Sequence, residues 1–92
     1  MVLEITELLL RPGAEERFTA FAEVTVRRLL TEPGCLSARL TRGLENPSRF
    51  VLLVEWETIT RSAAPTRQWP PELTPLFAAP PLIELFDPAG AP

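Results

Sequence analysis

The sequence predicts an α+β fold in which helices cover one face of a four-stranded antiparallel sheet. Four segments alternate apolar and polar residues with the two-residue period of a strand, and one has the period of an amphipathic helix. Two of the strand segments are separated only by a short turn, which is typical of an antiparallel hairpin. The resulting order, β-α-β-β-α-β, is the ferredoxin-like pattern.

The first two elements are a strand and a helix. Residues 2–10 form the strand, and Arg11-Pro12-Gly13 stops it. Its alternation predicts that Leu3 and Ile5 lie on one face of the strand. Glu4 and Thr6 lie on the other face. Residues 14–30 form the helix, which ends at Pro33-Gly34. The predicted apolar face of the helix holds Phe18, Phe21, Ala22, Thr25 and Leu29.

The hairpin follows, with strands at residues 35–44 and 49–57 and a turn at 45–48 that contains Asn46 and Pro47. On the first of these strands, Leu36, Ala38 and Leu40 share one face. On the second, the two faces are Phe50, Leu52, Val54 and Trp56 on one side, and Val51, Leu53, Glu55 and Glu57 on the other.

The last third of the chain is rich in proline, with eight of the eleven prolines between Pro65 and Pro92. A second helix is expected within residues 58–79, but prolines inside it predict a shortened or broken one. We expect a short segment after Thr66 and one turn from Pro75, with Thr74 as N-cap. Residues 82–86 form the final strand. The prediction is one domain at 1–88 and a tail at 89–92.

The sheet face away from the helices is predicted to be too apolar for water, because it carries Leu3, Ile5, Val51 and Leu53. Such a face usually packs against another surface. The expected partner is a second copy of the chain, which makes the protein a homodimer.

Composition excludes several classes of chemistry. The chain has no His, Tyr or Lys and a single cysteine, Cys35. These absences rule out a histidine metal site, a cysteine zinc cluster, a Schiff-base lysine and a Ser-His-Asp triad, so no metal is expected. A net charge of −3 disfavours nucleic acid. No signal peptide or membrane span is visible, so a cytoplasmic location without membrane contact is expected.

Three stretches carry a family resemblance: Pro33-Gly34-Cys35-Leu36-Ser37, Leu44 to Phe50, and Leu53-Val54-Glu55-Trp56-Glu57. Together they resemble the antibiotic biosynthesis monooxygenase domain family, whose members are dimeric α+β barrels. Trp69 and Phe77-Ala78-Ala79-Pro80-Pro81 are similar to features that the family often shows late in its second helix and before its last strand. The resemblance covers roughly residues 2–88.

The resemblance implies a cofactor-independent monooxygenase that acts on an aromatic polyketide, phenol or quinol in a cavity between sheet and helices. It implies that Trp56 lines this cavity and that Phe50 shares its face, while both also fit the alternative of plain core residues. It implies that Trp69 either caps the cavity or anchors a loop. Thr6 matches a first-strand position that is Asn in the haem-degrading branch, which counts against haem. Arg39 and Arg42 are possible donors to a substrate anion, or else solvated or dimer-pairing residues.

The sequence departs from the family in the segment after Trp56-Glu57. Family members usually continue with a stretch that contains His, and that stretch is missing here. The only conventional bases left are carboxylates. Glu55 and Glu57 are expected on the face opposite Trp56, and Cys35 is interpreted as a structural residue. The alternative function is therefore a non-catalytic homodimeric barrel that binds a small apolar ligand or is purely structural.

Overall fold

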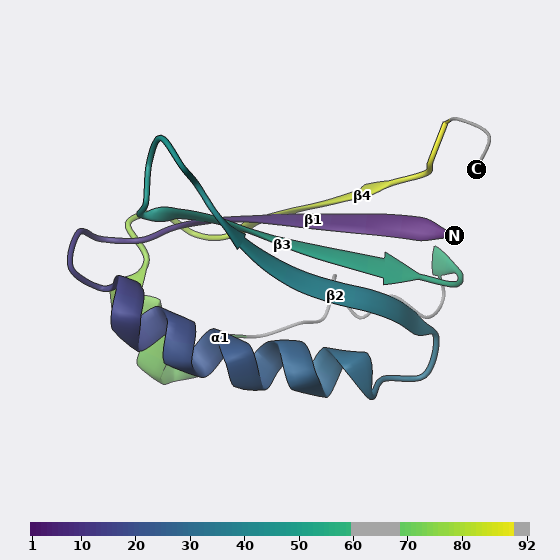
Figure 1. Ribbon diagram of the computed structural model, residues 1–92, viewed down its shortest axis with the longest axis horizontal. Helices are drawn as coiled ribbons and strands as arrows, with labels where there is room; N and C mark the ends of the chain where they lie inside the picture. The colour runs from purple at the N-terminus through teal and green to yellow at the C-terminus, as the bar shows by residue number, and fades with distance from the viewer. Residues whose placement is uncertain (60–68, 90–92) are drawn as a thin grey trace.

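The computed structural model describes residues 1–59 and 69–89, which form a four-stranded antiparallel sheet with its helices on one side (Figure 1). The strands lie in the order β2-β3-β1-β4. They are β1 (Val2–Leu9), β2 (Cys35–Arg42), β3 (Arg49–Trp56) and β4 (Leu82–Phe86). The helices are α1 (Glu15–Leu30) and a short 3-10 helix, η3 (Pro71–Leu76). The ferredoxin-like prediction is confirmed.

Three strands end slightly earlier in the structure than the sequence predicts. After the end of β1, backbone contacts still hold the chain. Leu10 leaves the strand but forms an isolated antiparallel bridge with Phe77. The N–H of Arg11 donates to the Leu76 carbonyl at 2.8 Å, and the N–H of Ala78 donates to the Leu9 carbonyl at 2.8 Å. The loop after β1 is therefore fixed to the segment that follows η3.

The second helix is short, as predicted, but its position differs. The predicted turn from Pro75 with Thr74 as N-cap is wrong, because η3 already begins at Pro71 and holds Pro75 inside it. Proline suits the first helical turn, where its missing N–H is not needed. The 3-10 helix stops after six residues and buries Leu73 and Leu76. The expected segment after Thr66 begins outside the described residues.

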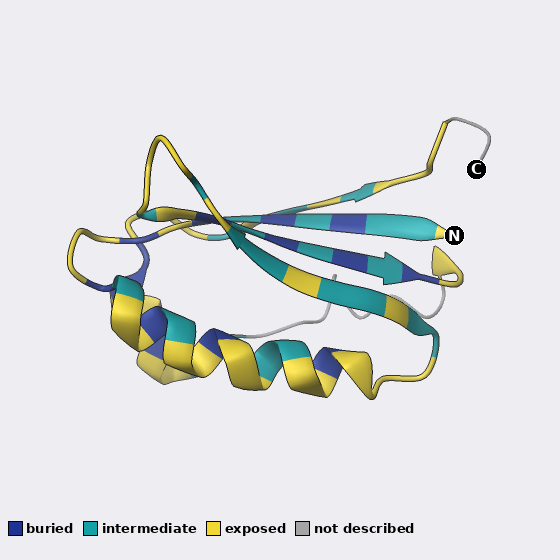
Figure 2. Cartoon of the chain, in the orientation of Figure 1, coloured by how far each residue is buried: buried dark blue, intermediate teal, exposed yellow. Residues whose placement is uncertain are grey.

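The core lies between α1 and the sheet, and Figure 2 shows buried residues along β1, β3 and α1. β3 contributes its whole predicted inner face, and α1 contributes Phe18, Ala22 and Leu29. Phe21 was expected there but is 40% exposed, because it lies off the centre of the packed stripe. Leu36 is 51% exposed because the β2–β3 register shifts between Cys35 and Ser37, and the extra residue of such a bulge is left unpaired.

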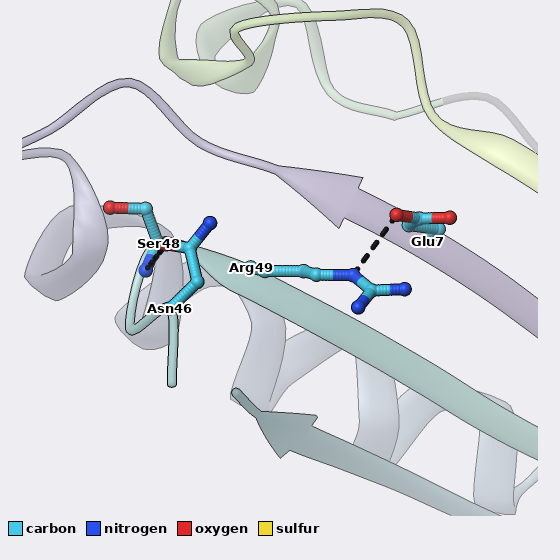
Figure 3. Close-up of polar contacts among 4 residues, drawn as sticks. All are labelled: Glu7, Asn46, Ser48 and Arg49. Carbon is cyan, nitrogen blue, oxygen red and sulfur yellow. Dashed lines mark hydrogen bonds and ion pairs between the residues drawn. The ribbon is translucent and has the colours of Figure 1, made fainter. Parts of the chain in front are cut away.

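The hairpin turn has a compact backbone that requires glycine at its start. The N–H of Gly43 donates to the Arg49 carbonyl at 2.7 Å, and a Cβ on Gly43 would lie 2.5 Å from the Asn46 carbonyl oxygen. The Asn46 side chain accepts the N–H of Ser48 at 3.1 Å, as Figure 3 shows. An Asx turn of this kind fixes where β3 begins.

The opposite face of the sheet is covered by none of the described elements (Figure 1). Its four predicted apolar residues are partly exposed, and β4 adds Leu82 and Phe86, which are 64% and 43% exposed. Arg49 Nε lies 3.0 Å from Glu7 Oε1 on this face (Figure 3). Within residues 1–59 and 69–89, no helix is long and apolar enough to cross a membrane.

Candidate functional site

A buried carboxylate lies on the helix-facing side of the sheet, near the start of β1. Glu4 has no exposed surface, and neither have Thr6 or Trp56. The indole N–H of Trp56 donates to Glu4 Oε1 at 2.9 Å, and the hydroxyl of Thr6 donates to Glu4 Oε2 at 3.2 Å. Each carboxylate oxygen therefore has its own donor. We call these three residues the Glu4 cluster.

Strand pairing brings the Glu4 cluster together. β1 and β3 are antiparallel neighbours in which Glu4 faces Val54 and Val2 faces Trp56. Trp56 is therefore the diagonal neighbour of Glu4, a separation that long side chains span. Thr6 follows Glu4 by two residues and so shares its face. Burying a charged carboxylate is costly unless hydrogen bonds satisfy it, and Trp56 and Thr6 supply two of them.

A second group of predicted residues lies around Phe18. The Phe18 ring is 5.1 Å from Phe50, 6.3 Å from Trp69 and 6.0 Å from Phe77, measured between centroids. Trp69 and Phe77 meet edge to face at 5.9 Å. Such tilted contacts are the favoured geometry for aromatic pairs. We call these four residues the aromatic cluster.

A pocket of about 620 Å³ opens beside the aromatic cluster. Trp69, Phe77, Pro80 and Pro81 supply most of its apolar wall, and Arg11 and Thr74 also line it. Among residues 1–59 and 69–89, no acceptor pairs with the buried Trp69 Nε1 atom. A buried donor left without a partner costs about 1–3 kcal/mol, so ring packing rather than a hydrogen bond holds this indole.

The predicted ligand-lining residues thus fall into two groups. Thr6 and Trp56 lie together in the Glu4 cluster, and Phe50 and Trp69 lie together in the aromatic cluster. Trp69 lines the open pocket, whereas Trp56 and Thr6 have no exposed surface. Two smaller hollows border α1, at about 240 Å³ beside Leu40 and about 390 Å³ beside Arg42.

The two candidate anion donors, Arg39 and Arg42, are on opposite faces of β2. Arg42 pairs with Phe50, and its guanidinium lies 5.5 Å from the Phe50 ring while its Nε donates to the Pro47 carbonyl at 2.8 Å. Arg39 pairs with Leu53 on the uncovered face. Both are exposed. Arg42 therefore borders the aromatic cluster, and Arg39 borders neither cluster.

The remaining sulfur and carboxylate candidates are not part of either cluster. Cys35 is only partly buried, and its thiol donates to the Ser37 carbonyl at 3.5 Å. Glu55 accepts the Ser37 hydroxyl at 2.9 Å on the uncovered face, and Glu57 is exposed. No group of three Cys, Asp or Glu side chains suited to a metal occurs in the part of the chain that the structure describes.

Glu4 is the functional candidate that the sequence reasoning missed. Alternation along β1 already placed it on the same face as Thr6, so the available signal was an acidic residue at an inward position. Among the described residues, Glu4 is the only charged side chain that is buried. Arg11 was also missed as a pocket residue, because the pocket forms only when the end of β1 meets residues 69–81.

Comparison with known families identifies the chain. The model of the antibiotic biosynthesis monooxygenase family matches residues 1–69, and the protein belongs to this family. No curated protein matches it. Most of the pocket lining lies beyond residue 69, outside the matched range, whereas the Glu4 cluster lies within it.

Solved structures show the same fold. A protein from Nitrosomonas europaea whose name places it among the antibiotic biosynthesis monooxygenases is similar at 19% identity and a TM-score of 0.87, covering 98% of this chain and 100% of its own. One from Bordetella bronchiseptica, named likewise, has 28% identity and a TM-score of 0.72, with 96% of each chain covered. One from Deinococcus radiodurans has 16% identity and a TM-score of 0.83, with 99% and 95% covered.

Proposed function

We propose that this protein is a cofactor-independent monooxygenase that acts on an aromatic polyketide, phenol or quinol, with Glu4 as the proton acceptor. The observation that carries the proposal is the buried Glu4 carboxylate, bonded to Trp56 and Thr6. Membership of the monooxygenase family supports it. A chain without His, Tyr or Lys has few other groups that could take a proton near neutral pH.

The chemistry is that of a substrate anion reacting directly with O₂. With an anthrone, Glu4 accepts a proton from the methylene carbon, and the resulting enolate transfers electrons to O₂. A carbon–oxygen bond forms, the O–O bond of the peroxide breaks, and the carbonyl product leaves with one water: R₂CH₂ + O₂ gives R₂C=O + H₂O. An enclosed apolar setting keeps competing water from the anion.

The Glu4 cluster has no exposed surface, so a substrate must displace part of its cover to reach Glu4. This burial favours a second candidate function, a barrel without catalysis that binds a small apolar ligand or serves as structure. A ligand that binds only the folded state raises its stability. Stabilisation by an aromatic ligand without oxygen consumption would therefore favour the second candidate.

Oxygen uptake tests the proposal. Metal-free protein is mixed with a panel of anthrones, naphthoquinols and phenols, and its rate is compared with the uncatalysed rate. We expect a saturable excess with at least one compound, and at least a tenfold loss of that excess in Glu4→Gln, which keeps the side-chain size but not the basicity.

The matched control is Glu57→Gln, which changes an exposed carboxylate next in sequence to Trp56 and is expected to keep the full rate. Thermal melts establish that both variants are folded. An equal rate in Glu4→Gln and wild type would remove Glu4 from the mechanism. An absence of excess across the whole panel would contradict the oxygenase proposal.

We also propose that the partner of the chain is a second copy, bound through the uncovered sheet face. The apolar side chains of this face are accompanied by both signs of charge, including Arg39, Arg49, Glu7 and Glu84. A surface with both signs can complement itself across a twofold axis. Neither cluster depends on the partner in this proposal, because both lie on the other side of the sheet.

A further inference from the structure

The pocket beside the aromatic cluster is distinct from the Glu4 cluster. It lies where the chain leaves β1, at Arg11, whereas Glu4 is near the opposite end of that strand. At about 3.3 Å per residue along a strand, the two are separated by roughly 20 Å. The volume of about 620 Å³ is in the range of small-molecule sites.

The described lining of this pocket carries a positive charge. Among the residues that the structure describes, Arg11 is the only ionisable side chain in this lining, and it is exposed. The part of the chain that the structure describes holds no ion pair or side-chain hydrogen bond of Arg11. Its backbone is fixed, because its N–H donates to the Leu76 carbonyl at 2.8 Å. A guanidinium on an anchored backbone with its donors uncommitted suits a carboxylate, which it can bind through two parallel hydrogen bonds.

The apolar wall of the pocket is aromatic and packed against the core. Trp69 and Phe77 meet edge to face, and both are held by Phe18. Pro80 and Pro81 close the lining with side chains that lose little conformational freedom. Flat apolar surfaces beside one cation favour a ligand that is itself flat, apolar and negatively charged.

We propose that this pocket binds a planar aromatic carboxylate, with the carboxylate on Arg11 and the ring system against Trp69 and Phe77. The proposal goes beyond the oxygenase function, because it needs neither oxygen nor Glu4. It also does not depend on the family, since most of the lining residues that the structure describes lie beyond the matched range.

The test uses 2-naphthoate as the probe and its neutral counterpart, 2-naphthalenemethanol, on the full chain. Calorimetry gives the affinities, and backbone amide shifts in NMR locate the probe. The variant is Arg11→Gln, and its matched control is Arg17→Gln, which removes the same charge from an exposed position on α1 outside the pocket. Thermal melts establish that both variants are folded.

We expect saturable binding of 2-naphthoate that is at least tenfold tighter than that of the alcohol. Arg11→Gln is expected to weaken 2-naphthoate binding at least tenfold, while Arg17→Gln and Glu4→Gln leave it within twofold. The largest amide shifts should fall at Phe77 and Ala78. Failure of 2-naphthoate to bind, equal affinities of Arg11→Gln and Arg17→Gln, or shifts centred on Thr6 and Trp56 would each overturn the proposal.

Discussion

At the scale of single residues, Trp56 has two roles in the same place. Its ring fills the core between sheet and helix with no exposed surface, and its N–H donates to a buried carboxyl oxygen of Glu4. These roles have separate energetic consequences, because a phenylalanine retains much of the ring but not the donor. Substitutions at one position can therefore separate packing from the hydrogen bond.

We expect Trp56→Phe to lower the free energy of unfolding by about 1–3 kcal/mol, the cost of leaving a buried polar partner without its donor. Trp56→Ala should lower it by about 3–5 kcal/mol, because it also removes a large buried side chain. Urea denaturation followed by circular dichroism measures both. A loss below 1 kcal/mol in Trp56→Ala would contradict the burial of Trp56.

The sequence predicted part of the Glu4 cluster. Alternation put Thr6 on one face of β1 and Trp56 on one face of β3, and each face is the one that packs toward the helices. The bond between Trp56 and Glu4 joins residues 52 positions apart, and it depends on the register between two strands that are not consecutive. Local periodicity contains no information on that register. The hydrogen bond between Trp56 and Glu4 was therefore not predictable from the sequence, although the inward position of Glu4 was.

At the scale of elements, the start of α1 is stabilised by the hairpin turn. Ala14, at the N-cap position, has no side chain that could accept a backbone N–H. The carboxylate of Glu15, one residue later, accepts backbone N–H groups instead. Hydrogen bonds from the backbone N–H of Glu15 itself and then from the Ser48 hydroxyl lower the pKa of Glu15. The Ser48 hydroxyl is 2.8 Å from Glu15 Oε1, so this bond also ties α1 to the β2–β3 turn.

A lowered pKa in the folded state means that the unfolded chain binds this proton more readily. The stabilisation from Glu15 is therefore present above the ordinary glutamate pKa of roughly 4.3 and is lost as the pH falls through the lower folded value. We expect Ser48→Ala to raise the pKa of Glu15 toward its ordinary value. NMR titration of the Glu15 side chain measures it, with Ser37→Ala as a control, because the Ser37 hydroxyl donates to Glu55 instead. An unchanged pKa in Ser48→Ala would remove Ser48 as a cause.

The elements differ in how well the sequence predicted them. α1 and β4 were predicted almost to the residue, because their periods are unbroken. The predicted position of the 3-10 helix was wrong, because a proline can either begin a helical turn or lie inside one. Pro71 begins the helix, and Pro75 lies inside it. The bulge at Cys35–Ser37 leaves no local signal, because it depends on how β2 meets β3.

At the scale of the whole molecule, the sheet has one face in the core and one face uncovered. The uncovered face includes the exposed Leu82 and Phe86 and the partly exposed Ile5 and Leu53. Isolated apolar side chains on a surface are ordinary, but a continuous set on adjacent strands is typical of an interface. The order of the strands makes this set continuous, because β1 lies between β3 and β4.

We expect light scattering at 10 μM, a concentration on the order of ordinary protein affinities, to give twice the chain mass of 10.3 kDa. Leu53→Lys should give a monomer, because it places a charge in the middle of the apolar face. The control is Leu44→Lys, at a turn position that is 98% exposed, and it should stay dimeric. A folded wild-type monomer would contradict the proposed interface.

The separation of the two clusters also gives the protein two optical reporters. The chain has no tyrosine, so its near-ultraviolet emission comes from Trp56 and Trp69 alone. Trp56 is enclosed beside a carboxylate, and Trp69 forms the wall of an open pocket. Replacing either indole by phenylalanine leaves a single fluorophore. The emission of that single tryptophan then reports quenching or ligand binding at one end of the sheet, without a signal from the other end.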